Sequence, residues 1–366
     1  MSKTKDRKSY WKLALFPIIT FTLFYGLRFG RFIDWNEYEE RYRLLGISPN
    51  NGDYELLFSY LCHWMASTGI HYQFLILLNV FLVIWAMMWL WKTSTYREAL
   101  VFIFLVFICS VLQIEQLIRW FFGVSLFIFS ICFLLRKKYL YYTIFSICSC
   151  LMHIGFLPLV FFFLGIYLVK IKLLSSKLCI ILFAFSIILG HTNMLLWLSP
   201  YLNFLAINEK TTLYIDSFSS IVTVGLKGDG VWTYDTASKI RMFLAYSYPI
   251  FCLNKLIKER GMAVWLANLY SIAIIILPIF NMVEILDRYS GTVILISAPI
   301  VIGMSFSHFI SNYKNLSKPM RIYAILSFLC AIYPLMNFFR RTDWWWMLFI
   351  WDANGRSALP VNLFLN

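Results

Sequence analysis

Long apolar runs recur along almost the whole chain, and each is close to the roughly 20 residues that a helix needs to cross a bilayer. They predict spans at residues 13–27, 71–91, 98–115, 118–135, 178–198, 241–257, 262–283, 289–310 and 321–338. Of the 366 residues, 61% are hydrophobic and only 14% are charged, whereas soluble domains average about 25% charged residues. The expected fold is therefore an all-α, polytopic helix bundle integral to a membrane.

The apolar segment 139–169 is too long for one ordinary crossing and too short for two. Its middle, residues 153–158, holds a histidine, a glycine and a proline. This segment either crosses the membrane once as a long helix or forms a broken, hairpin-like segment. The hairpin is favoured because it returns the lysines of residues 170–177 to the side that holds most other Lys and Arg clusters. With this segment, the sequence predicts about 10–11 membrane segments.

The net charge of +14 is explained by topology. Lys and Arg are concentrated in residues 1–12 and in the connections that share one face with them, and cytoplasmic loops carry such an excess. We therefore expect a cytoplasmic N-terminus and no nucleic-acid partner. The eight cysteines form no C-x-x-C pair, and no His stands at zinc-ligand spacing, so no metal is expected.

A single transmembrane domain is expected at 13–338, with long external loops at 28–70 and 199–239. Loops of this length are usually functional or disordered. The glycines of 225–230 lack the Lys-Ser or Lys-Thr that ends a phosphate-binding loop, so they are interpreted as a turn. Residues 339–366 contain four tryptophans, which is typical of an aromatic belt at a membrane interface.

Ionisable residues at the outer ends of the spans are candidate functional groups, because a charge deep in hydrocarbon costs at least about 2.5 kcal/mol. They combine arginines, which bind phosphate, with carboxylates and a histidine that can transfer a proton. The candidates are Arg28, Asp34, Tyr38, Glu55, Arg119, His153 and Arg288. Such a cluster suits a lipid diphosphate, because an arginine stabilises the leaving diphosphate without a metal.

Each candidate also has a simpler explanation. Arg119 can extend to the outer headgroups, and Arg288 can pair with Glu284 four residues earlier. A lone histidine such as His153 is often only hydrogen-bonded within a bundle. If residues 31–42 are helical, Asp34, Glu37 and Tyr38 share one face and Glu40 and Arg41 lie elsewhere, although this helix can simply rest on the lipid surface.

Short motifs follow one another in a recognisable order over about residues 10–310. They are Arg28-Phe29-Gly30 with Asp34-Trp35 and Tyr38, Glu55-Leu56-Leu57-Phe58, Gly69 to Gln73, the segment of Arg119, the H-x-[GS] segment at His153, and Arg288-Tyr289. This order resembles the EpsG family of Wzy-type polysaccharide polymerases. The chain departs from the family pattern where Trp120 follows Arg119 and Leu56 follows Glu55.

The resemblance implies a multi-pass protein of the bacterial inner (cytoplasmic) membrane. Such a protein joins undecaprenyl-diphosphate-linked oligosaccharides at the periplasmic face into O-antigen, capsule or exopolysaccharide. It implies a metal-independent glycosyltransferase without a cofactor, which acts with the bilayer and the lipid-linked oligosaccharide as partners and with a chain-length regulator as a candidate protein partner.

The resemblance also implies roles for the candidate residues. Asp34 or His153 would deprotonate the acceptor hydroxyl, and Arg119 and Arg288 would hold diphosphate oxygens. Arg28 would help to orient the donor or a loop. The remaining residues, Glu55 and Tyr38, would complete the substrate site.

Two other functions stay open. A GT-C-type glycosyltransferase that uses a lipid-monophosphate sugar also places an acidic base soon after its first span, and Asp34 fits that role too. Its product would be one added sugar, whereas a polymerase makes a ladder of repeats. A flippase for lipid-linked oligosaccharides would need charged residues along a cavity open to both faces, and no inverted repeat is visible in the sequence.

Overall fold

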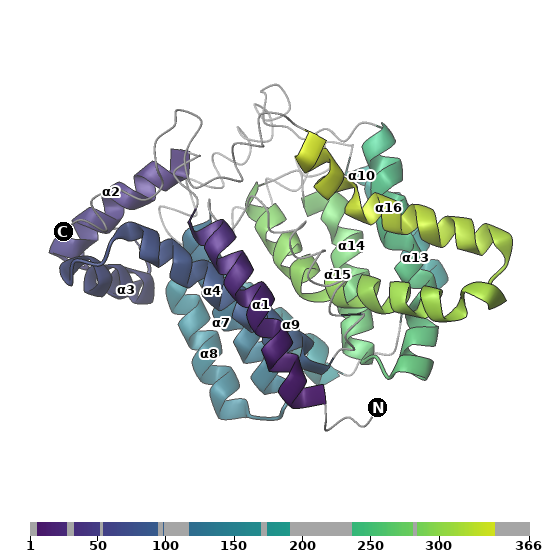
Figure 1. Ribbon diagram of the computed structural model, residues 1–366, viewed down its shortest axis with the longest axis horizontal. Helices are drawn as coiled ribbons and strands as arrows, with labels where there is room; N and C mark the ends of the chain where they lie inside the picture. The colour runs from purple at the N-terminus through teal and green to yellow at the C-terminus, as the bar shows by residue number, and fades with distance from the viewer. Residues whose placement is uncertain are drawn as a thin grey trace. The chain divides into compact units, whose positions relative to one another are not determined.

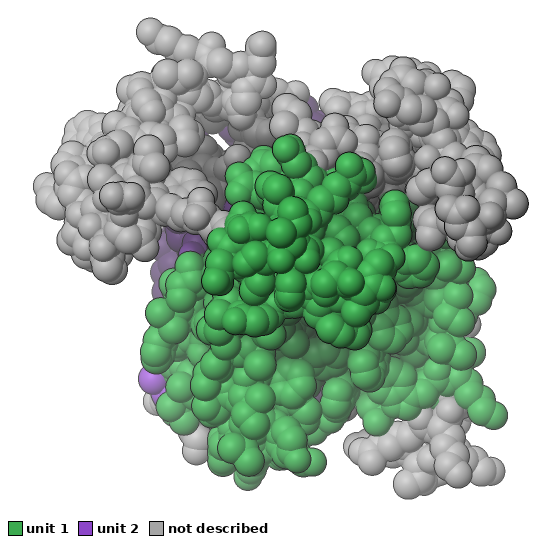
Figure 2. All heavy atoms as spheres, turned by 90° about the vertical axis from the view of Figure 1, so that its left-hand side faces the viewer, with its two compact units in different colours: residues 1–168, 334–366 green, residues 169–333 purple. Residues whose placement is uncertain are grey.

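The computed structural model describes residues 6–27, 33–51, 54–93, 98, 117–169, 174–190, 236–280 and 284–340. Every regular element within these ranges is a helix, as the sequence predicts. The chain divides into two compact units, with residues 1–168 and 334–366 in unit 1 and residues 169–333 in unit 2 (Figure 2). The single transmembrane domain expected at 13–338 stays a prediction.

Unit 1 consists of helices, several of which follow the predicted spans (Figure 1). They are α1 (Asp6–Gly26), α2 (Ile33–Ile47), α3 (Leu56–Ser67), α4 (Tyr72–Leu90), the 3-10 turn η1 (Trp91–Thr93), α7 (Ile118–Leu134), α8 (Tyr139–Met152) and α9 (Phe156–Val169). Helices α2 and α3 occupy the expected external loop 28–70. Apart from residue 98, the predicted span 98–115 lies outside the described residues.

Polar side chains fix how α1 and α4 pack against each other. The Tyr10 hydroxyl donates to the Met88 carbonyl at 2.6 Å, and the Gln73 side-chain amide donates to the Gly26 carbonyl. Because the beginning of each helix meets the end of the other, α1 and α4 are antiparallel. A Cβ at Gly26 would collide with Leu77 of α4, so the absence of a side chain allows this close approach.

Helix α7 is the most buried helix of unit 1, and α8 returns along it. The Ser149 hydroxyl of α8 donates to the Gly123 carbonyl of α7 at 2.9 Å. At the other end of the pair, the rings of Phe133 and Tyr141 stack with centroids 5.1 Å apart. Late α8 therefore meets early α7, and the two helices are antiparallel.

Helix α9 runs in the opposite direction to α8. Its Phe156 packs against Trp120 with ring centroids 4.5 Å apart, and its Phe163 packs against Phe127 at 5.0 Å. The earlier residue of α9 contacts the earlier residue of α7, and the later one contacts the later one, so α9 is parallel to α7. Because α8 is antiparallel to α7, the chain reverses direction within 139–169, as the predicted hairpin requires. With 14 residues each, α8 and α9 rise only about 21 Å, less than the roughly 30 Å of a hydrocarbon core.

Unit 2 is likewise built from helices that follow the predicted spans. They are α10 (Ser176–Leu189), α13 (Thr236–Arg260), α14 (Val264–Phe280), α15 (Glu284–Asn312), the turn η3 (Tyr313–Asn315) and α16 (Lys318–Arg340). The Tyr270 hydroxyl of α14 donates to the Tyr246 carbonyl of α13 at 2.9 Å. The end of the predicted span 178–198, most of the loop 199–239 with its glycine turn, and almost all of the C-terminal segment 339–366 lie outside the described residues.

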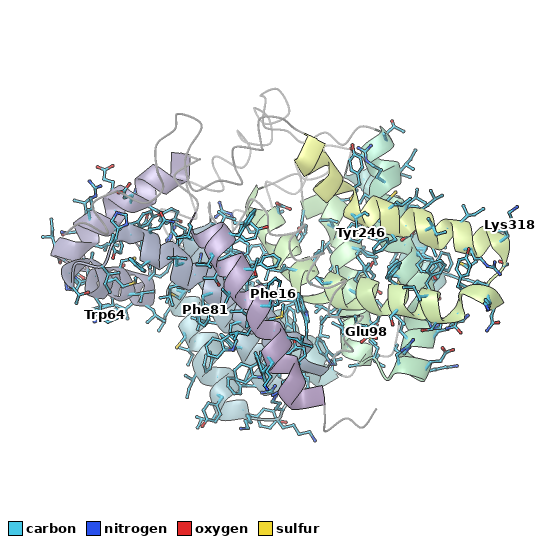
Figure 3. All side chains as sticks on the ribbon, viewed as in Figure 1. Phe16, Trp64, Phe81, Glu98, Tyr246 and Lys318 are labelled. Atoms are coloured by element: carbon cyan, nitrogen blue, oxygen red, sulfur yellow. The ribbon has the colours of Figure 1, made fainter. Side chains whose placement is uncertain are left out.

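The lengths of the helices and their exposed apolar side chains both bear on whether this is a membrane protein. By length and composition, α4 and the stretch Leu286–Asn315 are each able to cross a bilayer, and the other strongly apolar described helices are shorter. This is fewer than the 10–11 membrane segments expected. Large apolar side chains are also exposed along α1, α8 and α9, among them Phe16 at 74% (Figure 3). Monomeric soluble proteins rarely expose continuous apolar surfaces of this kind.

Candidate functional site

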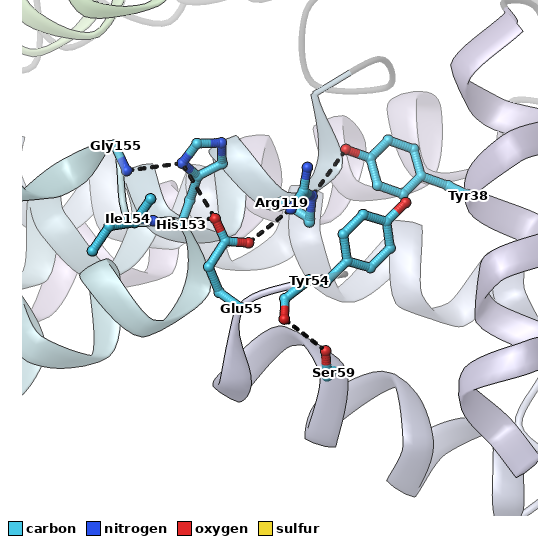
Figure 4. Close-up of polar contacts among 8 residues, drawn as sticks. All are labelled: Tyr38, Tyr54, Glu55, Ser59, Arg119, His153, Ile154 and Gly155. Atoms are coloured by element: carbon cyan, nitrogen blue, oxygen red, sulfur yellow. Dashed lines mark hydrogen bonds and ion pairs between the residues drawn. The ribbon is translucent and has the colours of Figure 1, made fainter. Parts of the chain in front are cut away.

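Four of the predicted site residues lie together in unit 1 (Figure 4). Tyr38 comes from α2, Glu55 precedes α3, Arg119 is the second residue of α7, and His153 lies between α8 and α9. With Tyr54, which contacts two of them, these residues form what we call the Arg119 cluster. Residues distant in the sequence therefore meet where α2 and α3 reach the beginning of α7 and the end of α8.

The Arg119 guanidinium is held from three sides. Its Nη1 pairs with Glu55 Oε2 at 2.7 Å, and its Nε donates to the Tyr38 hydroxyl at 3.3 Å. Its central carbon lies 4.1 Å from the centre of the Tyr54 ring, a cation–π distance. Arg119 is thus anchored in the protein, which argues against simple extension into the headgroups. Among the described residues, no hydrogen-bond acceptor engages Nη2.

Glu55 connects the arginine to the break between α8 and α9. While Oε2 binds Arg119, Oε1 accepts the Ile154 backbone N–H at 3.3 Å. The side chain is 20% exposed. Since both carboxylate oxygens already have partners, Glu55 is suited to positioning Arg119 rather than to taking a proton from a substrate.

His153 is oriented by the backbone of the same break. The Gly155 N–H donates to His153 Nδ1 at 3.0 Å, whereas the Glu55 carboxylate is 3.9 Å from that nitrogen, beyond hydrogen-bond distance. A nitrogen that accepts an N–H carries no proton, so the neutral ring has its proton on Nε2. In this state His153 presents a donor rather than a base. Its ring also packs edge-on against Trp120, with centroids 5.0 Å apart.

Tyr54 is a residue of the cluster that the sequence reasoning missed. Its ring stacks on Tyr38 with centroids 5.9 Å apart and faces Arg119. Burial raises the pKa of Tyr54 above its ordinary value, so the ring faces the arginine as a neutral phenol at physiological pH. The sequence feature that could have identified Tyr54 is its position directly before Glu55.

The expectation that Arg41 lies away from Glu37 and Tyr38 is wrong. Arg41 pairs with Glu37 at 2.9 Å, and its guanidinium carbon lies 5.2 Å from the centre of the Tyr54 ring. The physical reason is that residues four apart on a helix are neighbours. Arg41 therefore places a second guanidinium, paired with Glu37, beside the Arg119 cluster.

Three other predicted site residues are Asp34, Arg28 and Arg288. Asp34 lies in the first turn of α2, one turn before Tyr38, and the structure describes its backbone only. Arg28 lies outside the described residues. Arg288 belongs to α15 of unit 2. Roles for these three residues stay predictions.

The cluster has the composition of an anion site. It places the Arg119 guanidinium beside aromatic rings and a histidine donor, and Glu55 is the one carboxylate among the described side chains that contact Arg119. In the part of the chain that the structure describes, no group of three or more His, Cys, Asp or Glu side chains is placed to hold a metal ion.

Comparison with known families agrees with the order of the sequence motifs. The model of the EpsG family matches residues 11–350, almost the whole chain. This chain belongs to the EpsG family. No curated protein and no solved structure matches it. Membership of the EpsG family, together with the exposed apolar helices, makes this a membrane protein of the polysaccharide-polymerase type.

Proposed function

We propose that this EpsG-family protein joins undecaprenyl-diphosphate-linked oligosaccharide repeats at the periplasmic face of the bacterial inner membrane. Family membership supports the class of reaction. The observation that carries the proposal is the Arg119 guanidinium, which is fixed by Glu55, Tyr38 and Tyr54 and whose Nη2 meets no hydrogen-bond acceptor among the described residues. A fixed guanidinium is suited to phosphate oxygens.

The reaction creates negative charge on the leaving diphosphate. The acceptor hydroxyl oxygen forms a bond to the anomeric carbon of the donor sugar, while the bond from that carbon to the diphosphate oxygen breaks. The electron pair of the broken bond leaves with the diphosphate. Arg119 stabilises this charge without having to reorient, which is how fixed cationic groups lower such barriers. Arg28 and Arg288 would add contacts to the same diphosphate or to the donor.

The acceptor hydroxyl must also lose its proton. Glu55 has both oxygens engaged, and the Nδ1 atom of His153 accepts the Gly155 N–H. We therefore assign the base to Asp34, which shares the face of α2 with Tyr38. His153 would donate from Nε2 to an oxygen of the substrate.

The test uses the purified protein in lipid with synthetic undecaprenyl-diphosphate repeats of its host, and the products are resolved on a gel. The native protein is expected to give a ladder of repeats. Arg119→Ala should lower the rate by about 100-fold or more, the effect of removing one fixed donor of this kind. Arg43→Ala is the matched control, because Arg43 is 76% exposed and pairs with Glu39 within α2.

Other products in this assay would indicate a different function. A single added sugar, formed only with a lipid-monophosphate donor, would indicate the GT-C-type transferase. Movement of the lipid-linked repeat across the vesicle membrane without any product would indicate a flippase. A normal ladder from Arg119→Ala would remove Arg119 from the mechanism.

A further inference from the structure

Helix α3 has two faces of different character. Its buried face, which includes Phe58, Cys62 and Met65, packs within unit 1. On the opposite face, three large side chains are more than half exposed: Leu56 at 59%, Tyr60 at 53% and Trp64 at 59%. Their spacing of four residues aligns them along the helix, and we call them the α3 stripe. Figure 3 labels Trp64 on α3.

Charge is separated between α3 and its neighbour α2. No Asp, Glu, Lys or Arg occurs in α3. By contrast, α2 carries the ion pairs Glu37–Arg41 and Glu39–Arg43. The two helices are joined by a hydrogen bond between His63 Nδ1 and the Leu45 carbonyl at 2.8 Å. The pair therefore combines a charged surface with an uncharged, aromatic one, which is the character of elements that lie at a membrane surface.

The position of α3 in the chain places it beside a membrane crossing. Only residues 68–71 separate α3 from α4, which is long and apolar enough to span a bilayer. Gly69, with φ +78°, allows the sharp turn between them. At 12 residues, α3 rises about 18 Å, so it cannot cross the roughly 30 Å hydrocarbon core itself.

The apolar surface continues from α3 onto the break between α8 and α9. Ile154 is 61% exposed. Its backbone N–H is bonded to Glu55, the residue directly before the first member of the stripe. Leu157 of α9 is 45% exposed, and its backbone N–H donates to the Ile154 carbonyl at 3.0 Å. The stripe thus joins the outward apolar surface of the short helices α8 and α9.

We propose that α3 lies in the lipid–water interface, with the α3 stripe inserted among the headgroups and upper acyl chains and with α2 on the water side. Tyr and Trp are enriched at this depth because each ring combines an apolar body with a polar group. Since Glu55 immediately precedes α3 and binds Arg119, this anchoring holds the Arg119 cluster at the level of lipid phosphates. The insertion of α3 does not depend on the proposed reaction.

The experiment measures the depth of the stripe directly. An environment-sensitive fluorescent amino acid replaces Tyr60 in the full-length protein, and Trp64 in a second variant. Each protein is reconstituted into vesicles of phosphatidylethanolamine and phosphatidylglycerol, with or without bromine on the acyl chains. The matched control carries the same amino acid in place of Glu40, an exposed residue of α2.

At positions 60 and 64 we expect emission at shorter wavelength, loss of emission with brominated lipids and little quenching by aqueous iodide. Position 40 should show the reverse. Iodide quenching at positions 60 and 64 equal to that at position 40 would overturn the proposal, because the stripe would then face water. Protection from both quenchers would also overturn it and would indicate that another protein surface covers α3.

Discussion

The three contacts of Arg119 come from two segments of the chain, α2 and the adjacent residues Tyr54 and Glu55, and each has a separate physical role. Glu55 supplies the opposite charge, Tyr38 supplies a hydrogen-bond acceptor and Tyr54 supplies an aromatic face. Because the guanidinium is planar and rigid, fixing two of its nitrogens also fixes the direction of the third. The contribution of each contact is therefore separable by substitution.

Glu55→Gln is expected to slow ladder formation by about 10-fold to 100-fold. The amide keeps an acceptor for the Ile154 N–H but removes the charge that orients Arg119. Hydrogen bonds to charged groups contribute about 1.5–3 kcal/mol. Initial rates measure the effect, and Glu39→Gln, which removes the pair with Arg43 on α2, is the control expected to leave the rate unchanged. Equal rates for native and Glu55→Gln proteins would contradict a positioning role.

Tyr54→Phe and Tyr54→Leu separate the ring from its hydroxyl. The phenylalanine keeps the aromatic face below Arg119 and should retain nearly native activity. The leucine removes a cation–π contact of about 0.5–2 kcal/mol, so its rate should fall several-fold. If both variants lose activity equally, the hydroxyl rather than the ring is what matters. Polymerisation rates at saturating and limiting substrate would measure both effects.

His153→Asn and His153→Ala distinguish a hydrogen-bond donor to the substrate from a purely structural cap. Asparagine is a good acceptor for the Gly155 N–H and should preserve the thermal midpoint. Alanine removes the acceptor and should cost about 1 kcal/mol of stability. Both variants should lose activity if Nε2 serves the reaction. Full activity in His153→Asn would show that the ring acts only as a cap.

At the scale of elements, the hairpin of α8 and α9 depends on how closely it packs against α7. A Cβ at Gly123 of α7 would collide with the Phe156 ring of α9. Ser149 of α8 bonds the carbonyl of the same glycine. One residue without a side chain therefore admits both helices of the hairpin.

Gly123→Val is expected to destabilise unit 1 by about 1–3 kcal/mol, the usual cost of overpacking. Thermal unfolding in detergent, followed by helix content, would show a lower midpoint. Gly165→Ala is the control, because a Cβ at Gly165 in α9 has no heavy atom within 4 Å. It should leave stability unchanged or raise it slightly, since alanine favours helix more than glycine. Similar midpoints for the two variants would contradict the close approach at Gly123.

At the scale of the whole molecule, unit 1 has two distinct ends. The Arg119 cluster lies at the beginning of α7, and Lys138 lies beyond the end of that helix. Because α9 runs parallel to α7, Val169 also lies at the second end. Positively charged ends usually remain in the cytoplasm. This arrangement agrees with an external Arg119 cluster, which stays a prediction.

Labelling of introduced cysteines would test this orientation. In intact cells, a membrane-impermeant thiol reagent should modify Glu40→Cys on α2. It should not modify Lys138→Cys or Val169→Cys until the cells are opened. The unsubstituted protein provides the background, because it already contains eight cysteines. Modification of Lys138→Cys and protection of Glu40→Cys in intact cells would reverse the topology.

The sequence by itself determined most of the long apolar helices and the class of protein, but it predicted a loop where α2 and α3 lie. Crossing lengths and runs of apolar side chains are local properties, so the bounds of α4, α7 and α14 agree closely with the predicted spans. The interruption of the apolar segment 139–169 could be predicted for the same reason, because it too is a local property of the sequence. The motif order also sufficed to identify the EpsG family, to which the chain belongs.

Only the tertiary structure decided how the candidate residues are connected. Glu55 and Ile154 are 99 residues apart, and no local pattern specifies that the carboxylate of one accepts the backbone N–H of the other. Tyr54 was missed because an aromatic residue in a loop becomes part of a site only when an arginine from another helix packs on it. Apolar patterning fixes which faces are buried, whereas these long-range polar contacts depend on the packing of α2, α3, α7 and the α8–α9 hairpin.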